Sequence, residues 1–272
     1  NFMKKKLTAL VLTLVLILGV VLCFASCSSG KDGDSTTGGD VKASDIQYIK
    51  DKGVMIIGIT EYKPMNYKEN GAWTGFDTEF AEAVCKKLGV KAEFFLLADW
   101  DGKVSELNAK TIDVVWNGMT ITDDLKKGMD ISDPYVLNEQ VVVCKAENAS
   151  KYAAAESIKD AKIAVEKGSA GEELVKDYEN VNPVQYQSDA LLEVKSGAAD
   201  VAIVDITMAN SMTGEGSSYA DLTKTVALSS EEYGIGARKG TDTVQAINEV
   251  IKELKADGTL QALADKYGLT LA

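Results

Sequence analysis

The stretch IDVVWNGMTITDDL, residues 112–125, decides the fold. Residues 112–116 are apolar except for one acid, which predicts a strand covered on both faces. Thr122, followed by Asp123 and Asp124, predicts the start of a helix, because a threonine hydroxyl can accept a hydrogen bond from an N–H of the first helical turn. A buried strand that leads through a loop into a helix is the unit from which parallel, doubly wound sheets are built.

The same alternation continues on both sides of this stretch. Before it, strands are predicted at residues 54–59 and 91–97, with helices at 76–88 and 103–110. After it, the order repeats, with strands at 162–165, 184–186 and 201–204 and helices at 172–177 and 189–196. Each set is a short β-α-β-α-β unit, so we expect an α/β protein with two similar lobes.

Residues 118–125, together with Ile131-Ser132-Asp133-Pro134-Tyr135, resemble the signature of the polar-amino-acid family of bacterial solute-binding proteins, the receptors of ABC importers. The likeness extends roughly over residues 52–268. It implies two doubly wound lobes joined by two hinge strands, with a ligand cleft between the lobes. The apolar strands 140–145 and 233–238 are then the hinge. Lobe 1 would comprise residues 45–141 plus 233–272, and lobe 2 residues 142–232.

The resemblance also implies a set of ligand-binding positions, most of which follow a predicted strand, where ligands of doubly wound sheets bind. Aromatic rings can stack on a ligand, and the alternative for each ring is packing under a neighbouring loop. A glycine lets backbone approach closely, and a threonine offers a hydroxyl and an N–H. The predicted ligand-binding residues are Tyr62, Trp100, Gly118, Thr120, Leu125, Ser169, Ala170 and Asp205.

Asp205 and the turn at Ser169 and Ala170 are expected to bind ligand groups of opposite charge. Asp205 ends the strand 201–204 and matches the family residue that pairs with the ligand's ammonium group. A buried carboxylate without a partner is costly, and a cationic ligand would satisfy it. Ser169 and Ala170 form a strand-to-helix turn whose N–H groups are expected to face a carboxylate; the alternative is an ordinary turn.

Leu125 departs from the family pattern, which has an arginine there that grips the α-carboxylate of the ligand. Lys126 and Lys127 are poor substitutes, because the next helical position points about 100° away. Glu61 and Glu166 add acids near the expected cleft. These residues suggest a ligand with an amine group and little need of an α-carboxylate. Arg238, the one arginine of the chain, matches a family position close to the hinge instead.

The N-terminal residues predict export. Lys4, Lys5 and Lys6 precede an uncharged apolar run that ends in Phe24-Ala25-Ser26-Cys27. This is a signal peptide over residues 1–26 whose end resembles a lipobox, so Cys27 is the expected lipid site and residues 27–44 a flexible tether. A retained membrane anchor and plain secretion are the alternatives. Each places the remaining chain outside the cytoplasm.

Composition excludes several function classes. The formal charge of −12 argues against nucleic acid as a partner, and the absence of histidine removes the commonest general base and metal ligand. No cysteine spacing predicts a zinc site, and Cys85 and Cys144 are expected to be free and buried rather than a disulfide.

The predicted function is that of a monomeric, lipid-anchored binding protein that delivers an amino acid or small amine to an ABC permease, without cofactor and without catalysis. Two alternatives stay open. One is a ligand sensor of the same fold, and the other is a dehydratase derived from it.

Overall fold

The computed structural model describes residues 44–272. The predicted signal peptide, the lipid site at Cys27 and the tether up to residue 43 lie outside the described residues. Within residues 44–272, no helix has the length and apolar composition that a membrane span requires.

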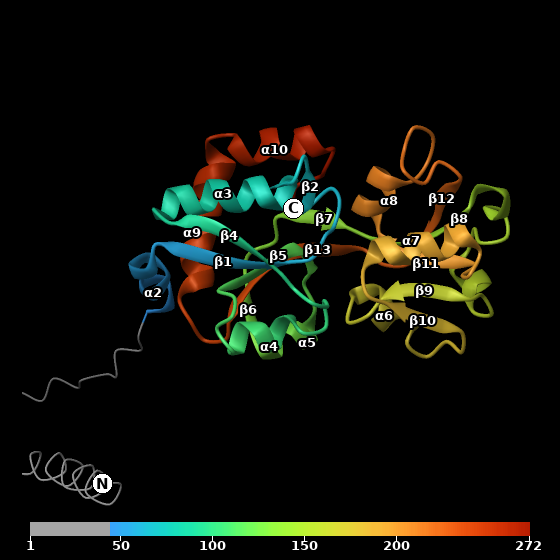
Figure 1. Cartoon of the computed structure of the whole chain (residues 1–272), viewed down its shortest axis with the longest axis horizontal. Coiled ribbons are helices and arrows are strands. Elements are labelled where there is room, and N and C mark those ends of the chain that lie inside the picture. Colours follow the sequence, from blue (N-terminus) through green and yellow to red (C-terminus); the bar gives the residue numbers. More distant parts are fainter. Residues whose placement is uncertain (1–43) are drawn as a thin grey trace, which may run out of the picture. The chain divides into compact units, whose positions relative to one another are not determined.

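The first sheet combines the beginning and the end of the described chain (Figure 1). Three of its strands run parallel, namely β1 (Val54–Ile59), β4 (Lys91–Leu96) and β5 (Val114–Thr120). β13 (Glu231–Arg238) lies antiparallel to β5 and also pairs with β6 (Met129–Ile131) and β7 (Val136–Asn138). The strand order is β4-β1-β5-β13-β6, with β7 also on β13. The first six residues of β5 are buried, as the apolar composition of its beginning predicts.

Helices cover both faces of this sheet. They are α2 (Asp45–Lys52), α3 (Phe76–Leu88), α4 (Lys103–Asn108), α5 (Asp123–Gly128), α9 (Thr243–Ala256) and α10 (Thr259–Tyr267). In Figure 1, α3 and α10 lie on one side of the sheet and α4 and α5 on the other. Phe76, Phe80 and Val84 recur at a spacing of four along α3 and are fully buried, so they form the buried face of this helix. Gly89 ends α3 in the left-handed conformation, at φ 78°.

A small hairpin, β2 (Tyr67–Glu69) and β3 (Ala72–Thr74), precedes α3. Asn70 and Gly71 both have positive φ in its turn, at 51° and 81°, the conformation that an Asn-Gly pair favours in a tight hairpin.

The second sheet is made by the middle of the chain. β9 (Ile163–Glu166), β10 (Val181–Val184) and β11 (Val201–Asp205) run parallel, and β8 (Gln140–Lys145) and β12 (Leu222–Ala227) complete the order β10-β9-β11-β8-β12. Its helices are α6 (Ala170–Val175), α7 (Gln187–Ser196) and α8 (Ile206–Met212), with the short 3-10 helices η1 (Ala146–Asn148) and η2 (Ala155–Ile158). β9 and β11 are buried along their whole length. The described chain therefore has the two α/β lobes that the sequence predicts.

The chain crosses between the two sheets twice. The first crossing lies between Asn138, in β7, and Gln140, in β8; the second lies between β12 and β13. The expectation that strand 140–145 leaves the first lobe was wrong, because Gln140 already pairs with Asp205 of the second sheet.

Two further expectations from the sequence need correction. β5 continues to Thr120 instead of ending at residue 116, because the antiparallel β13 supplies partners for Met119 and Thr120. Arg238 does not lie beside the crossing. It is at the other end of β13, buried, and it pairs with Asp45 and Asp113.

The remaining features of the core follow the sequence. Cys85 on α3 and Cys144 on β8 are free and buried, as predicted. Trp116 is fully buried and packs edge-on against Phe80, so it belongs to the core.

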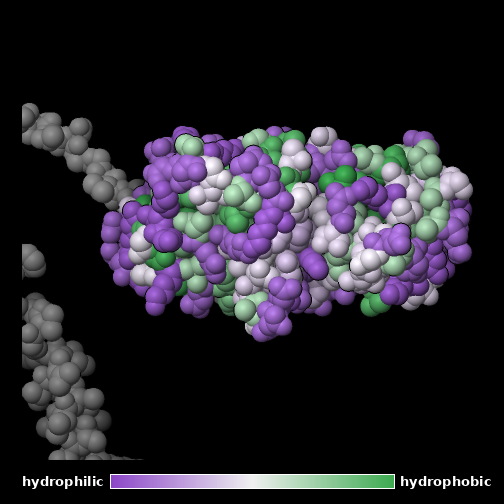
Figure 2. Space-filling view, turned by 90° about the horizontal axis from the view of Figure 1, so that it is seen from above, coloured by the Kyte–Doolittle hydropathy of each residue, from purple (hydrophilic) through white to green (hydrophobic). Residues whose placement is uncertain are grey.

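The face of residues 44–272 that Figure 2 presents is mostly hydrophilic, and its hydrophobic residues are scattered between polar ones.

Candidate functional site

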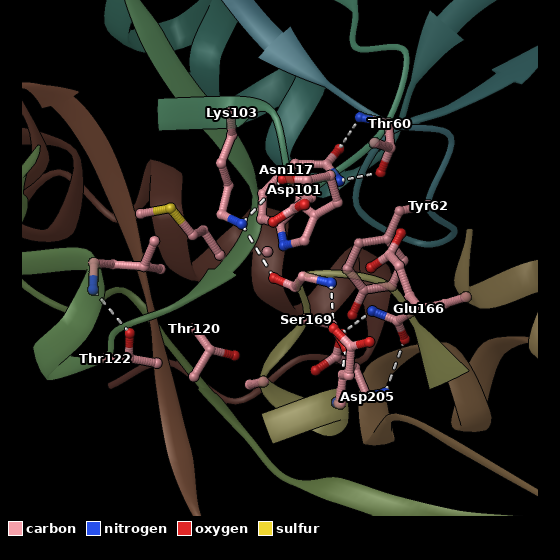
Figure 3. Close-up of a pocket in the computed structure, with 18 of the residues that line it drawn as sticks. Thr60, Tyr62, Asp101, Lys103, Asn117, Thr120, Thr122, Glu166, Ser169 and Asp205 are labelled. Atoms are coloured by element: carbon pink, nitrogen blue, oxygen red, sulfur yellow. Dashed lines mark hydrogen bonds between the residues drawn. The ribbon is translucent and has the colours of Figure 1, made fainter. Parts of the chain in front are cut away.

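A polar cavity of about 300 Å³ lies between the two lobes. It is bordered by the ends of β1 and β5 from the first sheet and of β9 and β11 from the second, so it occupies the position expected for doubly wound sheets. All eight predicted ligand-binding residues line this one cavity: Tyr62, Trp100, Gly118, Thr120, Leu125, Ser169, Ala170 and Asp205. Figure 3 shows several of them with side chains from both lobes converging on the same space.

Polar contacts made by side chains join the two lobes around the cavity. The hydroxyl of Tyr62 lies 2.5 Å from Thr207 Oγ1 of the second lobe and 2.7 Å from the Tyr233 hydroxyl. Gln185 Nε2 donates to the carbonyl oxygen of Ala98 at 2.7 Å, and Lys167 pairs with Asp101 at 3.1 Å. These polar contacts between the lobes are of a kind that is readily exchanged with water.

The two predicted aromatics differ in their surroundings. Tyr62 is 3% exposed, and burial raises the pKa of its hydroxyl well above the ordinary range. Trp100 is 7% exposed and packs with Leu97 and Leu107 in a small core cluster. Trp100 therefore borders the cavity and also has the packing role that the alternative interpretation gave it.

Gly118 and Thr120 are held by carboxylates. The N–H of Gly118 donates to Asp77 Oδ2 at 2.6 Å, and the hydroxyl of Thr120 donates to Glu231 Oε1 at 3.0 Å. Asp77 is fully buried, and burial raises its pKa to about 7. The segment that faces the cavity is therefore positioned by acids from α3 and β13.

We expect Gly118→Ala to lower the free energy of unfolding by roughly 2–4 kcal/mol, through strain at φ 57° together with overpacking. A Cβ at this position would lie 2.6 Å from Tyr62 Cε1 and 3.2 Å from Tyr233 Cε2, and both rings are held by their hydroxyls. Denaturant unfolding would measure the change. Gly71→Ala is the matched control, because Gly71 has φ 81° and open space around it. Equal losses in the two variants would rule out the steric contribution.

Leu125 lines the cavity and brings no charge to it. Its N–H donates to Thr122 Oγ1 at 3.1 Å, which confirms Thr122 as the cap that starts α5. Lys126 and Lys127 are exposed and form ion pairs with Asp123 and Asp124, and neither borders the cavity.

The second lobe contributes the turn into α6. Ser169 caps this helix, with its hydroxyl accepting from the Glu172 N–H at 3.1 Å, and Ala170 is the first helical residue. The Gly168 N–H donates to the Glu172 carboxylate at 2.7 Å. The Ser169 hydroxyl and the Gly168 N–H are thus already hydrogen-bonded within the turn.

Asp205 is 3% exposed and is surrounded by amide donors instead of cations. Asn138 Nδ2 and Gln140 Nε2 donate to Oδ1 at 2.5 and 2.6 Å, and Gln187 donates to Oδ2. No lysine or arginine within residues 44–272 forms an ion pair with it. Burial raises the pKa of Asp205, and the charge of the nearby Glu231 acts in the same direction, so that the pKa is about 7.

Glu166 lies on the same side of the cavity and is 5% exposed. Burial raises its pKa to about 8, the charge of Asp205 acts in the same direction, and Lys103 opposes both. The cavity therefore contains two buried carboxyl groups that a ligand cation would return to their charged forms.

Several cavity residues were missed by sequence reasoning. They are Thr60, Asp101, Lys103, Asn117, Gln140 and Gln187. Lys103 had a usable signal, since it comes three residues after the predicted aromatic Trp100. The amides had none, because glutamine and asparagine are common at any surface position.

The chain is similar to known proteins in sequence and in structure. Residues 55–270 match the model of the bacterial extracellular solute-binding proteins, family 3. The L-cystine-binding protein TcyJ of Escherichia coli K12 is 33% identical over 225 residues, which cover 80% of this chain and 84% of that protein. The arginine-binding extracellular protein ArtP of Bacillus subtilis is 31% identical over 270 residues, covering 93% and 96%. The crystal structure of the P235GK mutant of ArgBP from T. maritima superposes with a TM-score of 0.76 at 34% identity, over 82% of this chain and 98% of that one. This chain belongs to the bacterial extracellular solute-binding proteins of family 3.

Proposed function

We propose that this protein binds an amino acid in the cavity between its lobes, with the ligand's amino group on Asp205, and delivers it to an ABC permease. One observation carries the proposal. Asp205 is a buried carboxylate that has three amide donors and no cation within the described residues. An ammonium group that entered the cavity would supply the missing charge.

The charge of the cavity supports a ligand with a net positive end. Seven carboxylates line it, on Glu61, Asp101, Asp124, Glu166, Glu172, Glu173 and Asp205, against one lysine, Lys103. The relatives named for cystine and arginine share this family, and both of those ligands carry α-amino groups. We therefore favour a cationic or diamino ligand of this kind over an acidic one.

The cellular context is inferred from the sequence pattern alone. We propose lipid attachment at Cys27, a tether over residues 27–44, and a monomeric receptor at the outer face of the membrane. The lobe boundaries are proposed at the two crossings, between Asn138 and Gln140 and between β12 and β13. Transport is preferred to catalysis because the related proteins compared above are named as binding proteins.

The proposal is tested by a thermal-shift panel on the purified protein. The panel contains cystine, arginine, histidine and glutamine, with glutamate and acetate as acidic comparisons. A ligand that binds only the folded state raises the melting temperature according to RT ln(1 + [L]/Kd). We expect a shift with at least one of the amine-rich amino acids. A panel in which no amino acid shifts the transition would refute the proposal.

Affinity should fall in acid. The pKa of Asp205 is about 7 in the free protein, so below this pH its carboxyl group must lose a proton before it can pair with an ammonium. Each pH unit below 7 then costs up to about tenfold in affinity, and we expect binding at about pH 5.5 to be at least tenfold weaker than at about pH 7.5. Titration calorimetry at both pH values would measure this. Equal dissociation constants would contradict the pairing with Asp205.

A further inference from the structure

We infer that Lys103 is the residue that holds the ligand's carboxylate, which makes the preferred ligand a zwitterion spanning the cavity from Asp205 to Lys103. This inference rests on the proposed function and adds to it the identity of the anion-binding group. The position is on α4, at the first helical residue after the Trp100 loop.

Lys103 is a buried cation inside the cavity. It is 4% exposed and lines the cavity wall. Its Nζ donates to the carbonyl oxygen of Trp100 at 3.0 Å and to that of Gly168, from the other lobe, at 3.2 Å. Figure 3 shows the side chain extending from the first lobe towards the segment at Ser169.

The ammonium group has no anionic partner at ion-pair distance. An ammonium has three N–H donors, and two of them are accounted for by the carbonyl oxygens. Within the described residues Lys103 forms no salt bridge, although Lys52 and Arg238 of the same lobe do. Burial lowers the pKa of Lys103 to about 8, although the charges of Glu166, Asp101 and Asp99 act in the opposite direction, so the buried ammonium is only partly compensated. An incoming carboxylate would relieve the remaining cost of burial.

The other candidates for the anion are weaker. Leu125 has no charge, and Lys126 and Lys127 lie outside the cavity. The turn at Ser169 already uses its hydroxyl and the Gly168 N–H within itself. The Nζ of Lys103 also lies 4.6 Å from the centroid of the Trp100 ring. A ligand carboxylate on Lys103 and the Trp100 ring would therefore lie at the same end of the cavity.

This geometry changes the expectation for the ligand. Leu125 suggested a ligand with little need of a carboxylate, whereas Lys103 places a cation in the same cavity from a different helix. The Lys103 side chain bridges the two lobes, because its Nζ donates to the Gly168 carbonyl oxygen. A carboxylate bound to Lys103 would therefore favour the arrangement in which the two lobes are in contact.

The test uses pairs of ligands that differ only in the carboxylate: arginine against agmatine, and cystine against cystamine. We expect the native protein to bind the amino acid of the matching pair at least tenfold more tightly than its amine. Lys103→Met should weaken the amino acid at least tenfold and change the amine by no more than about twofold, as measured by calorimetry. Lys86→Met, an exposed position on α3, is the control for loss of one charge.

A second variant separates a binding role from a structural one. Leu125→Arg in the Lys103→Met background restores a cation to the cavity wall, and we expect it to recover the preference for the amino acid over the amine. Unchanged amino acid affinity in Lys103→Met, or equal losses for both members of a pair, would overturn the inference. A native protein that binds neither member of any pair, and none of the amino acids in the thermal-shift panel, would instead refute the proposed function itself.

Discussion

Asp205→Asn is expected to weaken binding of the amino acid ligand at least 100-fold. The substitution keeps the size of the side chain and removes its charge, so the ligand's ammonium would be buried against an uncharged amide. Truncating one partner of a buried, hydrogen-bonded charge pair commonly costs 2–5 kcal/mol or more, which is about 30- to 5,000-fold in the dissociation constant. Titration calorimetry should be done at about pH 7.5, where the native carboxylate is largely charged. The difference in dissociation constant between the native protein and the variant is then largest.

The stability of the free protein should change little in the same variant. Removing a buried carboxylate that has no cation stabilises the folded state. Against this, the new amide nitrogen would meet a donor, because Asn138, Gln140 and Gln187 all donate to the native carboxylate. We expect these effects to keep the melting temperature of the free protein within about 3 °C of the native value.

A matched control removes an exposed acid from the same lobe. Glu156→Gln loses only a surface pair with Lys159 and should bind ligand like the native protein. If Asp205→Asn retains the ligand-induced rise in melting temperature, the amino group does not bind at Asp205, and the central proposal fails.

Arg238→Met is expected to lower the free energy of unfolding by about 3–5 kcal/mol, the usual cost of breaking a buried ion pair from one side. Arg238 Nη2 lies 2.8 Å from Asp45 Oδ2 and 3.1 Å from Asp113 Oδ1, and these side chains are at most 8% exposed. Nη1 also donates to the carbonyl oxygen of Ile112 at 2.6 Å. The variant leaves Asp45 without its cation and the carbonyl without its donor.

Thermal unfolding would measure this loss as a melting temperature lower by roughly 10 °C. Lys252→Met serves as the control, because its pair with Glu249 is more than 60% exposed on both sides and should contribute less than about 1 kcal/mol. Since Arg238 does not line the cavity, the ligand affinity of the folded variant should be unchanged. Similar melting temperatures for both variants would show that the buried cluster adds no stability.

The elements that the sequence predicted well are those specified over a few residues. Apolar runs located β1, β9 and β11, and a single hydroxyl marked the start of α5 at Thr122. Hydrophobic periodicity and helix capping act within one or two turns, so neighbouring residues are enough to define them. Asp205 could be selected as a cavity residue for the same reason, because it ends a recognisable strand.

The partners of these residues depend on contacts between distant parts of the chain. Thr120 donates to Glu231, which is 111 residues away, because β13 returns to lie beside β5. The pairing of β13 with β5 also extends β5 beyond its apolar part. In addition, β13 brings Glu231 next to Asn138, where the two crossings lie side by side. No local pattern encodes which strand becomes the neighbour of another.

The sequence by itself determined two α/β lobes, the places where their strands end, and the position of an acid, Asp205, at the end of one of these strands. Only the tertiary structure decided that Lys103 enters the cavity that Leu125 leaves without charge, and that Arg238 stabilises the first lobe instead of the hinge. Local patterns set where a backbone turns or pairs, whereas the environment of a charge is set by whichever segments fold around it. A lysine in a short helix is ordinary in the sequence and becomes an anion site only when a second lobe closes over it.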